Sequence, residues 1–427
     1  MTTIPQLYKY FLACSQVSTD TRQISKDCFF IALKGDKFDG NTFAKTALEQ
    51  GAKYVVVSDV EVVTDERFLL VEDTLVALQQ LANYHRRQLT IPVIGLTGSN
   101  GKTTTKELIT CVLSKKFKTL STKGNLNNHI GVPLTLLSID STYEMAVIEM
   151  GANHQKEVEL LCGIAEPTHG LITNIGKAHL EGFGGIEGVK KGKGEMYDFL
   201  EATGGTVFVN VSSPTILEMA ESRNFKNRVD YLDNDTVELK EDSPFVVYQN
   251  TTNQMIRTHL TGKYNFENIA VALKIGEYFG VNIELSNEAV ASYNPTNNRS
   301  QVFEKGTNSI LMDAYNANPS SMSAAIENFI KLKADRKMVV LGDMLELGED
   351  ASAEHLALGK LVATGNFDVI VLAGPLMKDA LPVLPKAFYF PDKFSLHNWI
   401  IDHPQKNTHI LIKGSRGMGL ESIVQFL

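Results

Sequence analysis

The stretch from Val93 to Thr104 constrains the fold more than any other part of the chain. The apolar residues 93–96 predict a buried parallel strand, and the pattern of residues 105–109 predicts a helix. Between them, Gly98 and Gly101 allow the backbone to curl, so that successive N–H groups and the helix N-terminus face one anion. A strand, a glycine-rich loop and a helix in this order predict a loop that binds the phosphates of a nucleoside triphosphate.

Lys102 and Thr103 supply the cation and the hydroxyl that this chemistry requires. The Lys102 ammonium group is expected to contact the β- and γ-phosphates, and the Thr103 hydroxyl is expected to ligate Mg²⁺. The usual pattern is Gly-x-x-x-x-Gly-Lys-Ser/Thr, whereas Leu96 stands at its first position here, which leaves the shorter form Thr-Gly-x-x-Gly-Lys-Thr. An accidental glycine-rich turn is the alternative, and the flanking strand and helix argue against it.

Length and composition limit the class of protein. A chain of 427 residues exceeds what one core usually supports, which predicts two or three domains. The net charge of −8 argues against broad nucleic-acid binding. The four cysteines have no CxxC spacing, no apolar run is long enough to span a membrane, and the N-terminus has no signal-peptide pattern. These features predict a cytoplasmic protein.

Strands and helices alternate along most of the chain. Before Val93, strands are expected at 28–33 and 54–57 and helices at 41–51 and 74–87; after residue 297, strands are expected at 309–312, 338–341, 369–372 and 410–412. The fold class predicted is α/β with three domains: a small N-terminal α/β domain over residues 1–88, a central P-loop doubly wound sheet over 89–296, and a Rossmann-like C-terminal domain over 297–427.

Several polar side chains stand where such a sheet binds ligands. Glu149 follows the strand 145–148, where a second Mg²⁺ ligand is expected, although a plain surface carboxylate is the alternative. His179 lies beyond the strand 170–175. It is expected to be a ligand at the site, and a purely structural histidine is the alternative. Lys190, Lys191 and Lys193 fall in a glycine-rich segment that turns helical through Glu195, and their chemistry alone leaves them on a solvated face.

Asparagines form two further candidate groups. Asn265 and Asn268 are three residues apart in a predicted helix, so they share a face that can contact a base or ribose. The segment 124–133 contains Asn127 and Asn128 and is too rich in Gly and Asn to be core. Turn formation and ligand binding explain that segment equally well.

Taken together, these segments resemble the Mur ligase family, the ATP-dependent amino-acid and peptide ligases of peptidoglycan precursor synthesis. The resemblance covers nearly the whole chain. It rests on the segments 97–104, Glu149-Met150-Gly151, 174–181, 192–195, Arg299, 313–320 and 413–418. The last two, with 124–133, look like the branch that joins D-alanyl-D-alanine to a UDP-N-acetylmuramoyl-tripeptide.

The resemblance implies a role for each matching residue. ATP would be bound by the loop and by three residues beyond it, namely Gly98, Ser99, Asn100, Gly101, Lys102, Thr103, Thr104, Asn268, Arg299 and Asp313. Two Mg²⁺ ions would be held by Thr103, Glu149, His179 and Lys193, the last as a carbamylated lysine. Catalytic residues would be Lys102, Glu149, His179, Lys193 and Arg299. The UDP-sugar, tripeptide and dipeptide would contact Thr21, Arg22, Asn41, Asn127, Asn128, Tyr315, Asn316 and Asn318.

The activity implied is ligation through an acyl phosphate, with ADP and phosphate released. The chain would act in the cytoplasm as a monomer, without nucleic acid and without a membrane span. Two rivals are a folate or diaminopimelate ligase, which adds a different amine, and a P-loop kinase or switch protein. The segment 313–319 and the three-domain layout weigh against both rivals.

Overall fold

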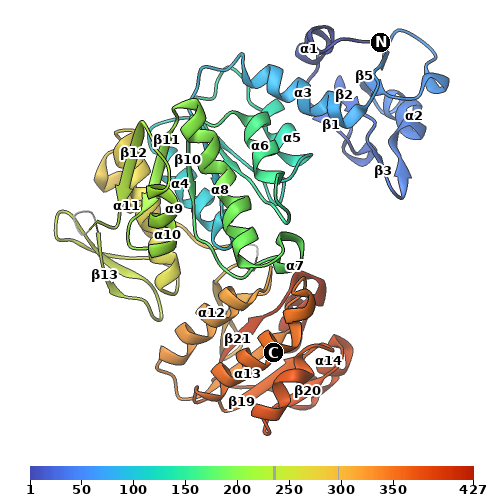
Figure 1. Cartoon of the computed structure of the whole chain (residues 1–427). Coiled ribbons are helices and arrows are strands. Elements are labelled where there is room, and N and C mark those ends of the chain that lie inside the picture. The colour runs from blue at the N-terminus through green and yellow to red at the C-terminus, as the bar shows by residue number, and fades with distance from the viewer. Residues whose placement is uncertain (234–236, 297) are drawn as a thin grey trace.

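The computed structural model describes residues 1–233, 237–296 and 298–427, which form three α/β units in chain order. Figure 1 shows the N-terminal and C-terminal units attached to different sides of the central unit. The predicted fold class is confirmed. Residue 297, the predicted start of the third domain, lies outside the described residues. Within the described ranges, no helix is both long and apolar enough to cross a membrane.

The N-terminal unit is built on a small parallel sheet with the order β1-β2-β5-β6. Its core strand is apolar on both faces, because every residue of β2 is buried. The sheet strands are β1 (Val17–Ser18), β2 (Cys28–Ile31), β5 (Ala52–Val57) and β6 (Phe68–Leu70). A hairpin of β3 (Lys34–Gly35) and β4 (Phe38–Asp39) and the helices α1 (Ile4–Leu12) and α2 (Ala44–Glu49) complete it. The helix expected over 41–51 is split, since its first residues form the 3-10 turn η2 (Gly40–Phe43).

Helix α3 (Thr74–Arg86) connects the first unit to the second. Asp73 caps its N-terminus by accepting hydrogen bonds from the N–H groups of Leu75 and Val76. Leu78, Leu81 and Ala82 are fully buried in a core that continues into the central unit. The helix therefore packs as part of both units.

The central unit is a six-stranded parallel sheet with the order β12-β11-β10-β7-β9-β8. Its strands are β7 (Val93–Thr97), β8 (Thr119–Ser121), β9 (Met145–Glu149), β10 (His169–Ile172), β11 (Thr206–Asn210) and β12 (Asn227–Tyr231). Chain order reverses on either side of β7, and the carboxyl ends of strands at such a reversal form the usual ligand crevice of an open α/β sheet.

Helices cover both faces of this central sheet. One face packs against α4 (Lys102–Leu113), α10 (Lys263–Tyr278) and α11 (Ile283–Ser292). The other packs against α5 (Gly131–Leu137), α6 (Glu157–Ala165), α8 (Ile186–Thr203) and α9 (Pro214–Glu221), and α7 (Leu180–Phe183) precedes α8. A small antiparallel sheet of β13 (Val237–Glu241), β14 (Val247–Asn250) and β15 (Met255–Arg257) projects beside it (Figure 1).

Helix α8 corrects one expectation about local structure. The glycine-rich segment around Lys190 to Lys193 is helical throughout, rather than becoming helical near Glu195. The glycines permit close packing, because a Cβ at Gly188 would lie 1.8 Å from the Phe183 carbonyl oxygen. Helix propensity is therefore overridden by tertiary packing.

The C-terminal unit is a second six-stranded sheet with the order β16-β17-β21-β18-β19-β20, in which only the edge pair β16–β17 is antiparallel. Its strands are β16 (Gln301–Lys305), β17 (Asn308–Asp313), β18 (Lys337–Gly342), β19 (Val369–Ala373), β20 (Phe388–Phe390) and β21 (His409–Lys413). Helices α12 (Pro319–Lys331) and α13 (Ala351–Ala363) cover one face, and α14 (Lys393–Asp402) with the 3-10 segment η7 (Leu420–Phe426) covers the other. The carboxyl ends of β17, β18 and β21 thus lie together at one edge.

Candidate active site

The loop between β7 and α4 has the conformation that its glycines predict. Gly98 has φ of +143°, and a Cβ there would lie 2.0 Å from Thr173 Oγ1. Gly101 has φ of +78° and caps α4, while a Cβ there would lie 2.9 Å from Asn268 Oδ1. Any side chain at either position would collide with a neighbouring polar group, so the loop requires glycine twice.

Hydrogen bonds tie this loop to the segment after β10. The Ser99 and Asn100 N–H groups donate to the Asn174 backbone oxygen and to its Oδ1, each at 3.0 Å. The Ser99 hydroxyl also donates to the Gly176 carbonyl oxygen at 3.0 Å. Asn174 therefore shapes the loop, although sequence reasoning gave it no role of its own.

Lys102 begins α4 and turns back over the loop. Its Nζ donates to the carbonyl oxygens of Gly98 at 2.7 Å and Ser99 at 3.2 Å. Burial lowers the pKa of Lys102 to about 8; the Glu149 carboxylate opposes that shift and the Arg299 charge adds to it. The ammonium group is held in a confined position where an anionic ligand would favour its charged form.

Thr103 and Glu149 form a buried pair of oxygen donors beneath the loop. The Thr103 hydroxyl lies 2.9 Å and 3.2 Å from the two Glu149 carboxylate oxygens. Asn127 donates to Glu149 Oε1 at 2.8 Å, and the Glu149 N–H donates to the Thr122 hydroxyl at 3.0 Å. Glu149 ends β9, so the predicted position at a strand tip is correct.

Lys193 lies under the floor of the site on α8. Its side chain is 1% exposed, and its Nζ donates to the Ala152 carbonyl oxygen at 2.7 Å. Burial lowers the pKa of Lys193 well below its ordinary value, and the Lys102 charge lowers it further. This shift favours the neutral amine of Lys193, unlike the half-buried Lys190 one turn earlier in α8, which pairs with Glu218 at 2.8 Å.

His179 faces the C-terminal unit across the site. Its Nδ1 is hydrogen-bonded to the Glu346 carboxylate, and burial lowers its pKa against the opposing effect of that carboxylate. Glu346 was not predicted from the sequence. It lies in the loop after β18, four residues beyond Gly342, whereas Glu149 is the last residue of its strand, so the strand-end position that identified Glu149 does not single out Glu346.

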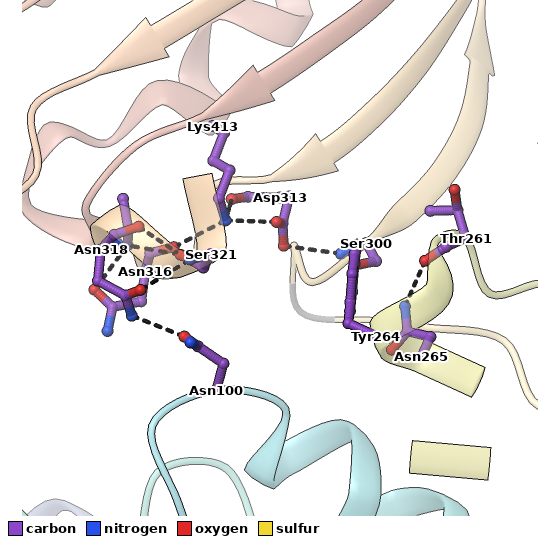
Figure 2. Close-up of polar contacts among 11 residues, drawn as sticks. Asn100, Thr261, Tyr264, Asn265, Ser300, Asp313, Asn316, Asn318, Ser321 and Lys413 are labelled. Carbon is purple, nitrogen blue, oxygen red and sulfur yellow. Dashed lines mark hydrogen bonds and ion pairs between the residues drawn. The ribbon is translucent and has the colours of Figure 1, made fainter. Parts of the chain in front are cut away.

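The segment after β17 reaches the phosphate-loop side of the site. Figure 2 shows Asn318 pointing toward Asn100, with Asn318 Nδ2 donating to Asn100 Oδ1 at 2.7 Å. Asp313 is paired with Lys413 at 2.5 Å and accepts a hydrogen bond from the Ser300 N–H at 3.1 Å. The Ser300 hydroxyl lies 3.0 Å from Tyr264 OH of the central unit, which continues this line of contacts (Figure 2).

Asn265 and Asn268 do share one face of α10, as predicted, and their side chains hold the helix against its neighbours. Asn268 donates to Asn265 Oδ1 at 3.0 Å and accepts from the Thr105 hydroxyl at 3.0 Å. Asn265 donates to the Thr261 carbonyl oxygen at 2.8 Å. Both are buried, so they fix α10 beside the first turn of α4.

A cavity of about 890 Å³ unites these groups. Its wall contains most of the predicted site residues, namely Ser99, Asn100, Gly101, Lys102, Thr104, Asn127, Asn128, Glu149, His179, Asn268, Arg299, Asp313, Tyr315, Asn316 and Asn318. Gly98, Thr103 and Lys193 lie outside that lining, although each bonds to a residue of the wall. A volume of this size suits a nucleotide together with part of a second ligand.

Three predicted substrate residues lie elsewhere, in the N-terminal unit. Thr21 begins the 3-10 turn η1 (Thr21–Gln23), and Arg22 pairs with Asp20 at 2.7 Å. Asn41 is buried, donates to Asp39 at 2.8 Å and accepts from the Ser58 N–H at 2.9 Å. None of the three lines the cavity.

The geometry supports the chemistry of anion binding and phosphoryl transfer. The N-terminus of α4, the confined Lys102, the Thr103–Glu149 pair and Arg299 from the C-terminal unit lie at or behind the wall of one cavity. Within residues 1–233, 237–296 and 298–427, no group of three or more His, Cys, Asp or Glu side chains could hold a metal ion unaided. A metal here would therefore need ligands from the substrate as well as from Thr103 and Glu149.

Comparison with known proteins places this architecture in a family. The models that match are described as Mur ligase family, catalytic domain (residues 14–94), Mur ligase middle domain (96–276) and Mur ligase, glutamate ligase domain (298–416). The chain is 36% identical to the UDP-N-acetylmuramoyl-tripeptide–D-alanyl-D-alanine ligase of Bacillus subtilis, over 96% of this chain and 92% of that protein. For the Escherichia coli protein of the same name the identity is 33%, over 96% and 93%.

Solved structures agree with the sequence comparison. A crystal structure of MurF from Acinetobacter baumannii has a TM-score of 0.85 and 30% identity, covering 99% of this chain and 98% of that one. The MurF ligase from Thermotoga maritima in complex with ADP has a TM-score of 0.84 and 26% identity, with 97% of each chain covered. The chain belongs to the Mur ligase family.

Proposed function

We propose that this protein is an ATP-dependent ligase that joins D-alanyl-D-alanine to UDP-N-acetylmuramoyl-tripeptide, forming the pentapeptide precursor of peptidoglycan. The observation that carries the proposal is one cavity whose wall contains Lys102, Glu149 and residues of the 313–318 segment of the third unit, with Thr103 bonded to Glu149 behind that wall. The full-length similarity to ligases of that name supports the choice of substrates.

ATP is proposed to bind with its phosphates on the loop. The N–H groups at the N-terminus of α4 face the phosphates, whereas those of Ser99 and Asn100 remain bonded to Asn174. Lys102 exchanges its carbonyl partners for phosphate oxygens. Arg299 has a buried Nε without a hydrogen-bond partner, which suits a residue that gains an anionic ligand. Asn268 and Asp313 complete the proposed ATP site.

Two Mg²⁺ ions are proposed to accompany ATP. The hydroxyl and carboxylate oxygens of Thr103 and Glu149 are donors of the type that Mg²⁺ prefers, and Mg²⁺ commonly adds substrate phosphates to one or two carboxylates. When bound, the ions would neutralise charge on the transferring phosphoryl group. His179 and a carbamylated Lys193 are proposed as ligands of the second ion.

Carbamylation of Lys193 agrees with its surroundings. CO₂ adds to a neutral amine and one proton is released, which converts a cation into an anionic carbamate with two oxygen donors. The lowered pKa of Lys193 favours the neutral amine that this addition requires. An unmodified lysine at this buried position has no metal-ligating oxygen, so the proposed second site depends on this modification.

The reaction is proposed to proceed in two steps. A carboxylate oxygen at the C-terminus of the tripeptide attacks the γ-phosphorus of ATP. The bond between that phosphorus and the oxygen bridging to the β-phosphate breaks, ADP departs, and the tripeptide carries an acyl phosphate. The neutral amine of D-alanyl-D-alanine then attacks the acyl carbon, the C–O bond to phosphate breaks, and the departing phosphate takes up the amine proton. Lys102 and Arg299 stabilise the charge and hold the groups in line.

The contacts between central and C-terminal units bear on the lifetime of the acyl phosphate. Water would hydrolyse that intermediate, so the cavity must exclude it. The hydrogen bonds of Asn318 with Asn100 and of Glu346 with His179 join the C-terminal unit to the phosphate-loop side of the central unit. We therefore propose that approach of the C-terminal unit precedes chemistry.

The remaining assignments extend the same proposal. Thr21, Arg22 and Asn41 are proposed to contact the UDP-sugar in the N-terminal unit, and Asn127, Asn128, Tyr315, Asn316 and Asn318 to contact the peptide substrates. Domain boundaries are proposed at 1–88, 89–296 and 297–427. A cytoplasmic monomer is proposed, because one chain supplies the whole cavity and the four cysteines are free.

A product assay tests the proposal directly. Incubation with ATP, Mg²⁺, UDP-N-acetylmuramoyl-tripeptide and D-alanyl-D-alanine should give ADP, phosphate and a product heavier than the tripeptide by one dipeptide less water. A product heavier by one phosphoryl group would instead indicate a kinase. Turnover with lysine, diaminopimelate or glutamate in place of the dipeptide would indicate a ligase for a different amine.

A further inference from the structure

Arg416 lies three residues beyond the carboxyl end of β21, which is an inner strand of the sheet of the C-terminal unit. The turn that carries it is held by several contacts. The preceding Ser415 is 4% exposed, its N–H donates to the Asp343 carbonyl oxygen at 3.1 Å, and its Oγ accepts from the Leu345 N–H at 3.1 Å. A Cβ at Gly414 would lie 3.0 Å from Gly342 Cα, so the backbones pack closely there. The guanidinium group is thus presented from a rigid base into the cavity wall.

Arg416 is also held by the ring of Tyr315. Its Nη1 donates to the Tyr315 hydroxyl at 3.1 Å, and its Cζ lies 5.0 Å from the ring centroid. Arg299 lies over the same ring with its Cζ 3.6 Å from the centroid. Two guanidinium groups at one ring create a positive region that favours an anionic group.

Four lysine and arginine side chains of the described residues line the cavity, and three of them are already accounted for. Lys413 is paired with Asp313, while Lys102 and Arg299 are assigned to ATP under the proposed function. Arg416 has no ion pair among the described residues and is exposed on the cavity side. Its charge is therefore free for the second substrate.

The incoming dipeptide carries one anionic group, its terminal carboxylate, which a positive charge such as that of Arg416 can bind. Its amine must reach the acyl carbon near the phosphate loop, which leaves its carboxylate at the other end, at most about 7 Å away for two extended residues. Carboxylates match the planar fork of an arginine, which can donate two parallel hydrogen bonds. Tyr315, Asn316 and Asn318, which are proposed to contact the peptide substrates, lie in the same C-terminal unit as Arg416.

We propose that Arg416, oriented by Tyr315, binds the terminal carboxylate of the incoming dipeptide and so selects acceptors that end in a free acid. This inference rests on the proposed function. It assigns Arg416 a substrate contact, and it gives Tyr315 the role of a positioning residue.

The test combines a change in the protein with a matching change in the acceptor. Formation of ADP and of ligated product is measured for native protein, Arg416→Gln and Arg416→Lys, with either D-alanyl-D-alanine or its C-terminal amide. Lys360→Gln, at an exposed lysine of α13 outside the cavity, is the control. The KM for ATP is measured for each variant.

Native protein should use the free acid about 10- to 100-fold better than the amide, since a hydrogen-bonded charge pair is lost. Arg416→Gln should raise the KM for the free acid by a similar factor, use acid and amide almost equally, and keep the KM for ATP within about twofold. Arg416→Lys should retain part of the preference, and Lys360→Gln all of it.

Equal use of acid and amide by native protein would overturn the inference without any variant, even if Arg416→Gln failed to fold. Arg416→Gln protein that keeps the native preference, or that raises only the KM for ATP, would also overturn it. Native protein that forms no ligated product with D-alanyl-D-alanine would instead reject the proposed function itself.

Discussion

Two junctions join the central unit to its neighbours, and they are built differently. At the N-terminal junction, α3 packs along α5 and α6, and its side chains are buried in a continuous core. Its last turn carries Arg86, whose guanidinium donates to the carbonyl oxygens of Ala165 at 2.9 Å, Glu166 at 2.9 Å and Leu89 at 3.0 Å. The N-terminal unit is thereby fixed by the same burial that stabilises the central unit.

At the C-terminal junction the buried apolar cluster also continues, through residues such as Ala317 and Met322, but polar pairs between side chains make up much of the contact. These pairs include Asn318–Asn100, Ser300–Tyr264, Lys177–Glu354, His179–Glu346, Asn328–Thr261 and Lys331–Asp242. Several are partly exposed, and exposed polar contacts exchange for water at little net cost in free energy. Because more of the C-terminal junction consists of such pairs, we expect it to be the more mobile of the two.

Replacement of Arg86 should have the largest effect on this comparison. Arg86→Ala leaves three backbone carbonyl oxygens without their donor in a mostly buried region, so we expect the free energy of unfolding to fall by about 3 kcal/mol. Urea unfolding measures the loss. The neighbouring Arg87→Ala is the control, because the Arg87 side chain is exposed and its ion pair is with the partly exposed Glu166, so the replacement should change little. Equal effects of the two variants would show that the buried contacts do not hold the junction.

His85 gives the same junction a dependence on pH. Burial lowers the pKa of His85, whose Nε2 is 2.8 Å from the Ile139 carbonyl oxygen. Because the unfolded chain then binds a proton more readily than the folded protein, stability should fall as the pH drops below about 6.5, by at most about 1.4 kcal/mol at pH 5.5. His85→Gln should remove this part of the slope in urea titrations across that range. An unchanged slope in the variant would assign it to other groups.

The sequence predicted the parts of the molecule that follow local rules. The strands 93–97 and 145–149 are apolar runs buried on both faces, and Glu149 could be found because it ends one of them. The glycines of the phosphate loop specify its conformation locally, so the loop and its lysine were identified together. Polar edge strands such as β12 and β16 give no such pattern and were not placed.

Residues that act across units could not be found in this way. Arg86 bonds to carbonyl oxygens about eighty positions later in the chain, and an arginine near a helix end looks the same whether it is exposed or buried. Glu346 pairs with His179 only because two separate sheets face each other. Such contacts depend on the arrangement of the units, which no spacing within one segment encodes.

The contact between Asn100 and Asn318 offers a test of the C-terminal junction. Asn100→Ala removes the acceptor for Asn318 and leaves the loop backbone bonds in place, so we expect kcat/KM to fall about fivefold, or about 1 kcal/mol, with a smaller change in unfolding free energy. Asn398→Ala, on the exposed side of α14, is the control. In the double variant with Asn318→Ala, the two losses in kcat/KM should not add. Full additivity would mean that the residues act separately.

Removal of the ion pair between Lys177 and Glu354 should have the smallest effect of these changes. The coupling energy of this pair measures how strongly one contact holds the C-terminal unit to the central unit. The Nζ–Oε1 distance of the pair is 2.5 Å, with the lysine side chain 53% exposed and the glutamate 15%. A double-mutant cycle with Lys177→Met and Glu354→Gln should give a coupling of about 0.5 kcal/mol in kcat/KM, because solvent screens the lysine end. That coupling should shrink as salt is raised from about 0.05 M to 0.5 M, whereas the Arg86→Ala loss in unfolding free energy should change far less. A salt-independent coupling above about 2 kcal/mol would mean that this junction is as rigid as the other, and the third unit would then be expected to stay in place throughout the reaction.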